Sequence, residues 1–585
     1  MSIWIKKEND INTKAMAETL KISPMMAQIL ANRGINSKNN AIKFLNPKRQ
    51  FLNSIENMKD AQNASSIILD GIAWGAKFVI YGDYDVDGVC STAILVKTIR
   101  SLGGNVDFYI PDRESEGYGL NSSAVSKLSL NFDILIAVDN GISAFDEVML
   151  GVQLGLKIII IDHHETFSEN DQELLPNATA IINPKQTQCP YPFKMMCAAG
   201  LSYRFSEYLH IQAKKEFELN NELIVLAALA TYCDVVDLIG ENRIIAKEGL
   251  NLLRDGQVEN LGLNSLILAR NITYGNINAQ AIGFIIGPCI NAAGRLENAK
   301  IAVELFLASN NADAVSLSNK LIELNEKRKK LCDEWVESAV ELVQKSEMPQ
   351  VLVLYLPEAH ESIAGIIAGR LKEKFFKPAF VFTNSGDFAK GSARSIPNYN
   401  LFQEMQNVKD LFIKFVGHPM AAGALMPIKN IEILKKELNN NCKLLDNDFM
   451  PKIEYEDELE IDEVIFEFAQ SLDILEPFGK SNKEPVFITQ NILAKDIIIM
   501  GPKRNALRMY FQASFGRKIY AVSFNSVQML LEMMEGVYNP TVIENFAKGS
   551  QKYIDAKLSI AYNIFINEYN GNQSLQLKIV DFKLV

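Results

Sequence analysis

Eight side chains of types that bind divalent cations fall in four short segments of this sequence. Hard divalent cations prefer several oxygen ligands, and Mn²⁺ also accepts an imidazole nitrogen. Aspartates combined with a histidine therefore favour Mn²⁺ or Mg²⁺ over structural zinc. Two such cations that share a carboxylate, about 3.5–4 Å apart, can hydrolyse a phosphoester. The eight residues are Asp83, Asp85, Asp87, Asp139, Asp162, His163, His164 and Asp234.

Each segment by itself also has an ordinary structural explanation. An Asp-x-Asp pair such as Asp83 and Asp85 is common on solvated loops and in calcium-binding loops. The adjacent His163 and His164 could be one core and one surface side chain. However, so many carboxylates in one crevice would repel each other unless cations neutralised them. The occurrence of all four segments in this order favours the metal-site hypothesis.

Three short apolar runs precede the polar segments and predict the elements that position them. Residues 78–81 run into GDYDVDG at 82–88, residues 134–138 into DNG at 139–141, and residues 158–161 into DHH at 162–164. Continuous β-branched runs are typical of parallel strands that helices cover on both faces. Ligands bind at the carboxyl ends of such strands, so we expect the polar segments to converge on one crevice. A predicted helix over 221–231 delivers Asp234.

The remainder of the chain changes pattern twice. Leucines and Trp335 recur at helical spacing over 317–342 and predict a long connecting helix. A second α/β segment begins at 351–355, and beyond about residue 450 short strands indicate a small β-barrel of the OB type. We therefore predict an α/β protein with five regions: a helical extension (1–50), a parallel-sheet domain (51–310), the connecting helix (311–346), a smaller α/β domain (347–450) and an OB-like barrel (451–585).

Composition narrows the class of protein. The 585 residues carry a net charge of −11, which excludes a uniformly basic nucleic-acid coat, so any nucleic acid must bind through a local patch. The seven cysteines show no zinc-type spacing and indicate reduced thiols. The sequence shows neither a signal peptide nor a membrane-spanning run, so we expect a cytoplasmic protein.

The motifs in their order resemble a known family. GDYDVDG at 82–88, AVDNG at 137–141, DHH at 162–164 and the segment around Asp234 resemble the four motifs of the DHH phosphoesterase superfamily. The companion DHHA1 domain has a counterpart in HES at 360–362, GSARSIP at 391–397 and GHPMAAG at 417–423. The RecJ family of exonucleases specific for single-stranded DNA is similar at RGI 33–35, FLNP 44–47, NAAGR 291–295, LEPFGKSNKEPVF 475–487 and NEYNG 567–571. The likeness runs over nearly the whole chain.

This resemblance implies roles for the candidate residues. The ligands of two metal ions would be Asp83, Asp85, Asp139, His163 and Asp234, and Asp139 would bridge the ions. His164 would face the scissile phosphate, while Asp162 and Asp87 would orient the ligands. The cations would activate a water for in-line attack on phosphorus. RecJ-like enzymes remove 5′-mononucleotides 5′ to 3′ from single-stranded DNA in repair and recombination.

The DHHA1-like domain would supply contacts to the substrate. Arginine offers a bidentate fork to phosphate, and serine offers a neutral donor. The candidates are His360, Arg370, Ser392, Arg394, Ser395 and His418, together with Arg295 of NAAGR. Three have structural alternatives: Arg370 could cap its own helix, His418 could pack in the domain interface, and Arg295 could form a buried ion pair.

Basic and aromatic residues alternate in the predicted barrel. Barrels of this type bind single strands through basic grooves beside aromatic platforms. The candidate contacts are Lys503, Arg504, Arg508 and Tyr510, near Arg517, Lys518, Phe511 and Tyr520. Because alternating aromatics in a barrel are usually core, we expect one of the three aromatic residues to face the groove.

Two sites depart from the RecJ-like pattern. Ala359 and Ser362 stand where the family tends to have tryptophan and glycine, and Val416 stands where it has glycine. None of these is a predicted metal ligand, so we expect altered fine specificity with retained activity.

Two other functions stay open. The chain could be a DHH-type phosphodiesterase of short oligonucleotides or cyclic dinucleotides, although such enzymes are generally shorter and lack the barrel. It could also be a non-catalytic replication scaffold with a decayed catalytic domain, against which the intact ligand set argues. For an exonuclease, the expected partner is single-stranded DNA, with a single-strand-binding protein and a helicase as candidate protein partners, and a monomer is the expected state.

Overall fold

The computed structural model describes residues 2–345, 347–569 and 571–585, which form two compact units. Residues 48–450 make one unit, and residues 1–47 join residues 451–585 in the other. The sequence pattern suggested that residues 1–50 are an extension of their own. In the structure, helices from the N-terminal segment share a hydrophobic core with the barrel.

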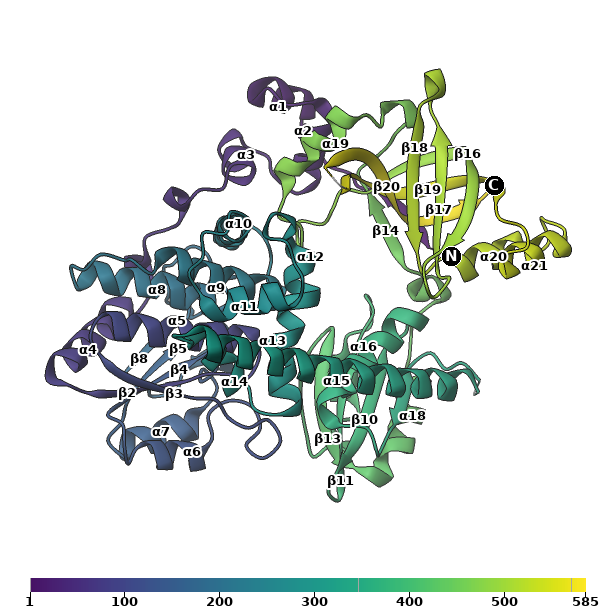
Figure 1. The fold of residues 1–585 in the computed structure, drawn as a ribbon. Coiled ribbons are helices and arrows are strands. Elements are labelled where there is room, and N and C mark those ends of the chain that lie inside the picture. Colours follow the sequence, from purple (N-terminus) through teal and green to yellow (C-terminus); the bar gives the residue numbers. More distant parts are fainter. Residues whose placement is uncertain (1, 346, 570) are drawn as a thin grey trace. The chain divides into compact units, whose positions relative to one another are not determined.

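A parallel sheet forms the centre of the first unit. Its order is β3-β2-β4-β5-β8. The strands are β2 (Lys77–Tyr81), β3 (Asn105–Tyr109), β4 (Ile134–Val138), β5 (Lys157–Ile161) and β8 (Ala180–Ile182). Figure 1 shows one layer of helices on each face of this sheet. The first layer contains α5 (Val86–Ser101), α8 (Ala198–Gln212) and α9 (Asn220–Cys233), and the second contains α6 (Ser122–Leu128) and α7 (Phe145–Gln153).

Both faces of the sheet are buried, as the continuous apolar runs predict. Ile80 and Ile136 belong to the core shared with α5, α8 and α9, whereas Val79 and Leu135 belong to the core shared with α6 and α7. Successive residues of a strand point to opposite faces, so a strand covered on both sides has no polar alternation. The predicted parallel-sheet domain is confirmed.

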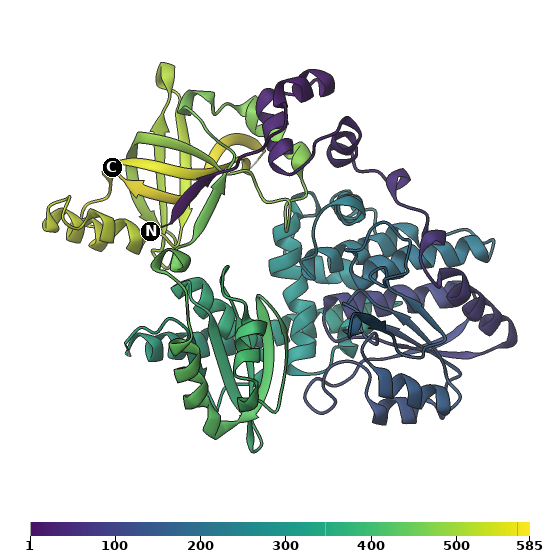
Figure 2. The ribbon, with the colours of Figure 1, turned by 180° about the vertical axis from the view of Figure 1, so that it is seen from behind.

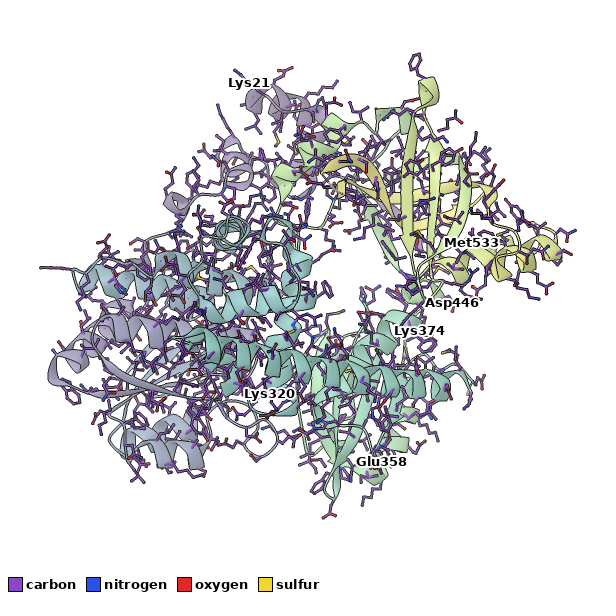
Figure 3. The ribbon with its side chains drawn as sticks, in the orientation of Figure 1. Lys21, Lys320, Glu358, Lys374, Asp446 and Met533 are labelled. Carbon is purple, nitrogen blue, oxygen red and sulfur yellow. The ribbon has the colours of Figure 1, made fainter. Side chains whose placement is uncertain are left out.

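The helices that follow lead to the second lobe of this unit. They are α10 (Gly240–Arg254), α11 (Leu261–Ala269), α13 (Gly287–Leu296), α14 (Lys300–Leu307) and α15 (Asn311–Gln344). A π-helical turn at Ile282–Ile286 precedes α13. The long α15 is the predicted connecting helix, and its Lys320, labelled in Figure 3, pairs with Glu297 at 2.9 Å.

A mixed sheet forms the second lobe. Its order is β12-β13-β11-β10-β9, and only β9 and β10 run parallel. The strands are β9 (Leu352–Tyr355), β10 (Ala379–Ser385), β11 (Phe388–Arg394), β12 (Lys414–His418) and β13 (Ala421–Pro427). The helix α16 (Ala364–Phe375) and the end of α15 cover one face, and α18 (Ile431–Asn440) covers the other.

The other unit contains a closed barrel. Its strands are β16 (Phe487–Met500), β17 (Ala506–Gln512), β18 (Lys518–Phe524), β19 (Ile554–Tyr569) and β20 (Asn572–Leu584). They pair in the order β16-β17-β18-β20-β19, and pairing of β19 with β16 closes the ring. The helices α20 (Val527–Met534) and α21 (Pro540–Lys548) connect β18 to β19. This confirms the predicted OB-like barrel.

The N-terminal segment is built into the barrel unit. The strand β1 (Ile3–Lys6) pairs in parallel with β14 (Lys452–Tyr455), and Figure 2 shows this strand beside the barrel. Three helices follow: α1 (Thr13–Leu20), α2 (Pro24–Asn32) and α3 (Lys38–Leu45). Arg33 of the RGI motif donates to the Asn482 side chain at 2.8 Å and to the Lys483 carbonyl at 2.8 Å. Two motifs of the RecJ-like pattern are therefore in direct contact.

Candidate metal centre

The loop between β2 and α5 carries the first aspartates. The Asp85 carboxylate caps α5 by accepting from the backbone N–H groups of Asp87 at 2.9 Å and Gly88 at 3.1 Å. The next turn packs directly on Asp83, because a Cβ on Gly88 would lie 2.4 Å from the Asp83 carbonyl oxygen. Only glycine allows this close approach. The loop therefore holds Asp83 and Asp85 against the first turn of the helix.

The ends of β4 and β5 and the end of α9 supply the other candidates. Asp139 follows β4 with a φ of 60°, a left-handed conformation that is uncommon for a residue other than glycine. Such strained backbone is concentrated at functional sites. Asp162, His163 and His164 follow β5, and Asp234 is the C-cap of α9. All four predicted segments thus meet at the carboxyl edge of the sheet.

Ligand atoms from these segments form three overlapping groups. In each group the atoms lie within 4.8 Å of one another. The groups are Asp83, Asp85 and Asp139; Asp87, His163 and Asp234; and Asp139, His163 and His164. Asp139 and His163 each belong to two groups. This arrangement is what two cations with a shared carboxylate require.

Unpaired oxygen atoms indicate that this centre fits cations. Among the described residues, the buried Oδ1 atoms of Asp83 and Asp139 have no hydrogen-bond partner. The Nε2 atom of His163 lies 3.1 Å from Oδ1 of Asp139 without forming a hydrogen bond. Two potential ligand atoms that lie this close without a hydrogen bond between them are positioned to bind the same cation. A buried carboxylate oxygen left without any partner would otherwise be costly.

The pKa values of the carboxyl groups in this cluster also indicate a cation site. Burial, reinforced by the charge of Asp85, raises the pKa of Asp83 well above its usual range. Burial and the charges of Asp87 and Asp85 do the same for the pKa of Asp139. Burial, together with the charge of Asp87, raises the pKa of Asp234 to about 7. The site therefore needs positive charge before all of its carboxylates can ionise.

Asp87 and Asp162 are occupied by hydrogen bonds to the protein. The two oxygens of Asp87 accept from the N–H groups of Ala198 and Ala199, each at 2.7 Å, at the N-terminus of α8. Asp162 accepts from the N–H of Ile142 at 3.1 Å and from Nδ1 of His164 at 2.7 Å. Both carboxylates thus hold neighbouring groups in place.

The two histidines differ in their environment. Burial and the charge of His164 lower the pKa of His163, which favours the neutral imidazole that a metal ligand needs. Burial alone would lower the pKa of His164, but its hydrogen bond to Asp162 and the charge of that carboxylate raise it to about 9. His164 is therefore cationic at neutral pH, and its side chain is 42% exposed.

A loop that the sequence analysis did not single out also reaches the centre. The segment 111–120 follows β3 and carries Tyr118, whose hydroxyl lies 3.3 Å from Nε2 of His164 and 3.3 Å from the Asp139 carbonyl oxygen. Arg113 lies over the Tyr84 ring at 4.9 Å, and its charge acts to lower the pKa of Asp83. β3 is an edge strand with partial polar alternation, so no long apolar run marked its end.

The NAAGR motif supports the metal loop from the other side. The Asn291 side chain accepts from the N–H of Val86 at 3.2 Å. A Cβ on Gly294 would lie 2.4 Å from the Tyr84 carbonyl oxygen. Arg295 donates to the Ser362 carbonyl at 2.7 Å and, within the described part of the chain, has no carboxylate within ion-pair distance. The buried ion pair considered for Arg295 is therefore not present.

The second lobe brings together some of the predicted substrate residues. The register aligns His418 of β12 with Ala421 of β13 and, across β13, with Arg394 of β11. Val416 is aligned with Gly423 and Ser392 in the same way. Side chains of directly paired residues share one face of a sheet. His418 and Val416 are exposed on this face. Burial lowers the pKa of Arg394, and no described carboxylate pairs with its guanidinium.

Three other residues of this lobe have protein partners. The Ser395 hydroxyl is buried and donates to the Tyr399 carbonyl at 2.6 Å. Arg370 is 66% exposed on α16 and pairs with Glu373 at 3.5 Å. His360 pairs with Glu114 of the 111–120 loop at 2.9 Å and contacts the Ser362 hydroxyl at 2.7 Å. The structure thus commits the Ser395 hydroxyl to a backbone carbonyl, whereas Arg370 and His360 each pair with a carboxylate.

The outer face of the barrel carries part of the predicted nucleic-acid site. Tyr510 and Tyr520 are cross-strand partners with ring centroids 6.0 Å apart, whereas Phe511 is core. Two aromatics face outward, not one, because Tyr510 and Tyr520 occupy the same side of adjacent strands. Arg508 lies on this face beside Val522. Lys503 and Arg504 lie in the β16–β17 turn, and Arg504 donates to the Ala547 carbonyl at 3.0 Å.

Comparison with known proteins agrees with this architecture. The DHH family N-terminal domain matches residues 77–231, the DHHA1 domain matches residues 348–444, and the RecJ OB domain matches residues 455–581. None of the described helices combines the length and apolar character that a membrane crossing requires.

Relatives match over nearly the full chain. The single-stranded-DNA-specific exonuclease RecJ of Bacillus subtilis is 33% identical over 99% of this chain and 70% of its own length. RecJ of Salmonella typhimurium is 30% identical over 99% of both chains. The crystal structure of Thermus thermophilus RecJ in complex with Mn²⁺ has the same fold, with a TM-score of 0.81 at 24% identity, and covers 99% of this chain and 79% of that one. With these matches over the DHH, DHHA1 and OB segments alike, this chain belongs to the RecJ family of single-stranded-DNA-specific exonucleases.

Proposed function

We propose that this protein is a two-metal-dependent exonuclease that hydrolyses single-stranded DNA from the 5′ end to 5′-mononucleotides, in DNA repair and recombination. The observation that carries the proposal is the set of three overlapping ligand groups joined by Asp139 and His163, with buried carboxylate oxygens that have no partner among the described residues. Membership of the RecJ family supports the substrate and the direction of cleavage.

The proposed cations are two Mn²⁺ or Mg²⁺ ions. The residues that would hold them are Asp83, Asp85, Asp139, His163 and Asp234. When bound, the ions supply a nucleophile at neutral pH and stabilise the charge that develops on the phosphate. A relative whose crystal structure is described as exonuclease RecJ bound to manganese is 28% identical over 68% of this chain and has a TM-score of 0.58.

The protein's own side chains orient the substrate and the ligands. The hydrogen bond from Nδ1 of His164 to Asp162 directs Nε2 outward, where the imidazolium can donate to a phosphate oxygen. Asp87 fixes the ligand cluster to the N-terminus of α8. Positive charge aimed at the place where negative charge develops is the main catalytic contribution expected of a fixed side chain.

The substrate path is proposed from the positions of basic side chains that have no carboxylate partner among the described residues. In the second lobe, Ser392, Arg394 and His418 would bind the 5′-terminal segment, and Arg295 would contact the strand near the metal loop. On the barrel, Arg508, Tyr510 and neighbouring residues would bind the strand further along. The local basic surfaces are consistent with a net charge of −11, because several of the carboxylates are committed to the metal centre.

The alternatives are less well supported. A phosphodiesterase of short oligonucleotides would have no use for the outer barrel face. A non-catalytic scaffold would have no need for the complete ligand set. We further propose a cytoplasmic monomer that acts on strands exposed by a helicase and covered by a single-strand-binding protein, because its substrate is single-stranded DNA.

The proposal is tested with 5′-labelled and 3′-labelled single strands and duplexes, incubated with Mn²⁺, with Mg²⁺ or with EDTA. We expect release of labelled mononucleotide from the 5′-labelled single strand with either metal and none with EDTA. Equal degradation of duplex, or no cleavage with either metal, would contradict the proposal. Mononucleotide release first from the 3′ label would contradict the direction alone.

A further inference from the structure

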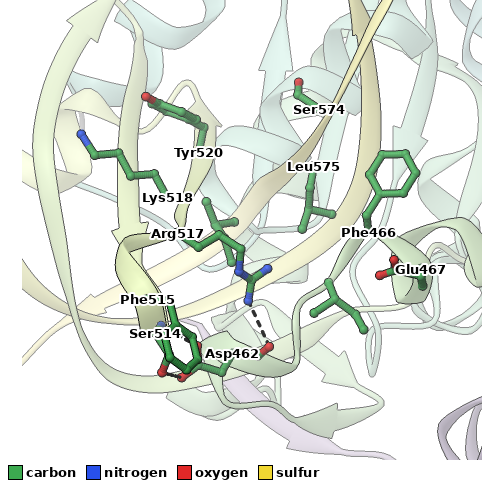
Figure 4. Close-up of a pocket in the computed structure, with 12 residues that line it drawn as sticks. Asp462, Phe466, Glu467, Ser514, Phe515, Arg517, Lys518, Tyr520, Ser574 and Leu575 are labelled. Atoms are coloured by element: carbon green, nitrogen blue, oxygen red, sulfur yellow. Dashed lines mark hydrogen bonds between the residues drawn. The ribbon is translucent and has the colours of Figure 1, made fainter.

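The barrel contains a cavity beside its basic and aromatic face. The cavity has a volume of about 780 Å³, within the range of small-ligand sites. It lies between the tip of the β17–β18 hairpin, the segment 462–467 and the start of β20. Figure 4 shows its lining, which includes Phe466, Phe515, Arg517, Lys518, Tyr520 and Leu575.

Phe515 stands at the rim of this cavity with its side chain entirely in solvent. Its exposed fraction is 108%, and its φ of 57° places it in the left-handed region at the apex of the hairpin. A phenylalanine in water contributes nothing to the stability of the fold, and its backbone conformation is unfavourable. A single exposed hydrophobic side chain is ordinary on a protein surface, but this one borders a cavity whose lining is largely apolar.

The hairpin tip is held rigidly. The Ser514 N–H and hydroxyl both donate to the Asp462 carboxylate, at 2.6 and 2.8 Å. Arg517 donates to the carbonyls of Val464 at 2.6 Å and Asp462 at 3.0 Å. Four hydrogen bonds thus fix the residues on either side of Phe515. Because the tip is already ordered, a ligand that stacks on Phe515 loses little affinity to ordering the loop.

The cavity is continuous with the outer face of the barrel. Lys518 and Tyr520 line the cavity and also belong to that face, where Lys518 Nζ lies 4.4 Å from the centre of the Tyr510 ring. Tyr520 is 42% exposed and pairs with Gln576 of β20. Within the described part of the chain, neither Lys518 nor Arg508 has a carboxylate within ion-pair distance. Their charges are therefore available for the phosphates of a strand that crosses this face.

The charges of the cavity favour an uncharged planar group. Its acidic side chains are Asp462 and Glu467 and its basic ones are Arg517 and Lys518, so neither an acidic nor a basic peptide is preferred. Asp462 and Arg517 are already committed to the hairpin. What is left is apolar and aromatic surface with one basic side chain, Lys518, and one acidic side chain, Glu467. A nucleobase stacked on an aromatic ring, with its phosphate near a lysine, matches this chemistry.

We propose that this cavity binds one unpaired base of the single strand, with Phe515 as the stacking platform and Tyr520 beside it. The proposal rests on the proposed function, since it assumes that the barrel binds single-stranded DNA. Stacking needs only a π-face, so the cavity accepts any base without sequence preference. It would hold the strand on the barrel independently of the metal centre.

The test compares two fluorescent strands of equal length, an oligothymidylate and an abasic strand with the same phosphates. Binding to the full chain is measured by anisotropy in EDTA, so that no cleavage occurs. We expect Phe515→Ala to weaken binding of oligothymidylate by about 5- to 100-fold, the effect of losing one stacked base. The same variant leaves binding of the abasic strand unchanged, and Phe515→Trp restores binding of oligothymidylate.

Tyr553→Ala is the matched control, because Tyr553 is an exposed aromatic of the same unit, at 56%, outside the cavity. It should bind both strands as the wild type does. Equal loss on both strands, or no loss on either, would overturn the assignment of the cavity. If the wild type cleaves and binds oligothymidylate while Phe515→Ala is indistinguishable from it, only the cavity assignment fails. If the wild type binds neither strand, the proposed function fails as well.

Discussion

At the scale of single residues, the metal centre depends on carboxylates that cannot all be ionised unless positive charge is bound next to them. Asp139 is the most constrained of them. It is 3% exposed, has a left-handed backbone and belongs to two of the three ligand groups. A residue in this position is difficult to replace, because both its side chain and its conformation are required.

The first prediction concerns the shared ligand. Asparagine tolerates the left-handed conformation, so Asp139→Asn changes the charge with little added strain. We expect cleavage of single-stranded DNA to fall by more than about 100-fold. Loss of a residue that only hydrogen-bonds to a metal ligand typically costs about 10- to 100-fold. Strand binding in EDTA should stay as in the wild type. Asp146→Asn, the same change on the exposed start of α7, is the control, and comparable activity in both variants would refute the shared-ligand role.

The second prediction concerns proton release. Burial raises the pKa of the proposed ligand Asp234 to about 7 and the pKa of Asp83 and Asp139 well above the usual range, and metal ligands must be deprotonated. Protons therefore compete with Mn²⁺ at low pH, and the affinity for Mn²⁺ should rise as the pH increases through about 7. Calorimetry in buffers of different ionisation enthalpy should detect proton release on Mn²⁺ binding at pH 6 and a smaller release at pH 8. An affinity that is constant over this range would contradict the raised pKa values.

The third prediction concerns Tyr118, whose hydroxyl contacts His164. Hydrogen bonds to charged groups contribute about 1.5–3 kcal/mol, so Tyr118→Phe should lower kcat by about 10-fold or more. KM should change little, because the loss affects the orientation of His164 more than strand binding. Steady-state kinetics on a labelled single strand separates the two constants. Tyr553→Phe serves as a control, and a change confined to KM would assign Tyr118 to substrate binding instead.

At the scale of elements, the metal loop is held between two helices. Asp85 is the N-cap of α5, and α13 contacts the loop through Asn291 and Gly294. The position of Asp83 and Asp85 is therefore set by helix packing as much as by the loop sequence.

The fourth prediction tests this support. An added Cβ at Gly294 would lie 2.4 Å from the Tyr84 carbonyl oxygen, so Gly294→Ala must displace the loop. We expect weaker Mn²⁺ binding by about 10- to 100-fold and a matching loss of activity, with the fold retained. Gly369→Ala on α16 is the matched control, because nothing lies within 4 Å of its added Cβ. The control should be fully active, and normal Mn²⁺ affinity in Gly294→Ala would contradict the supporting role of α13.

At the scale of the whole molecule, a buried polar network joins the N-terminal segment to the rest of the barrel unit. Glu456 is completely buried and pairs with Lys7 at 2.8 Å and Arg33 at 3.6 Å, and it accepts from Asn32 at 2.6 Å. All three partners belong to the N-terminal segment. The network thus ties residues 1–47 to the barrel.

The fifth prediction follows from this network. Arg33→Met removes one buried partner of Glu456 and the hydrogen bonds to Asn482 and Lys483. We expect the free energy of unfolding of the barrel unit to fall by about 3 kcal/mol, a decrease in Tm of roughly 6–12 °C. Lys6→Met, which removes the exposed pair with Asp457, should cost less than about 1 kcal/mol. Equal stability of the two variants in a thermal scan would contradict the buried network.

Much of the fold follows from local pattern. The continuous apolar runs at 78–81, 134–138 and 158–161 could only be satisfied by strands covered on both faces, and they became β2, β4 and β5. Because polar segments follow each run, their convergence at one edge of the sheet was predictable. The edge strand β3 lacked such a run, so the loop with Arg113 and Tyr118 was missed.

The sequence by itself therefore determined the class of each domain and the set of side chains that meet at the carboxyl edge of the sheet. Only the tertiary structure decided which candidates are committed to the protein, such as Ser395 and Arg504, and which have exposed side chains, such as His418 and Tyr520. It also decided that the N-terminal segment belongs to the barrel unit. The physical reason is that periodicity encodes burial within one element, whereas hydrogen-bond partners come from segments far apart along the chain.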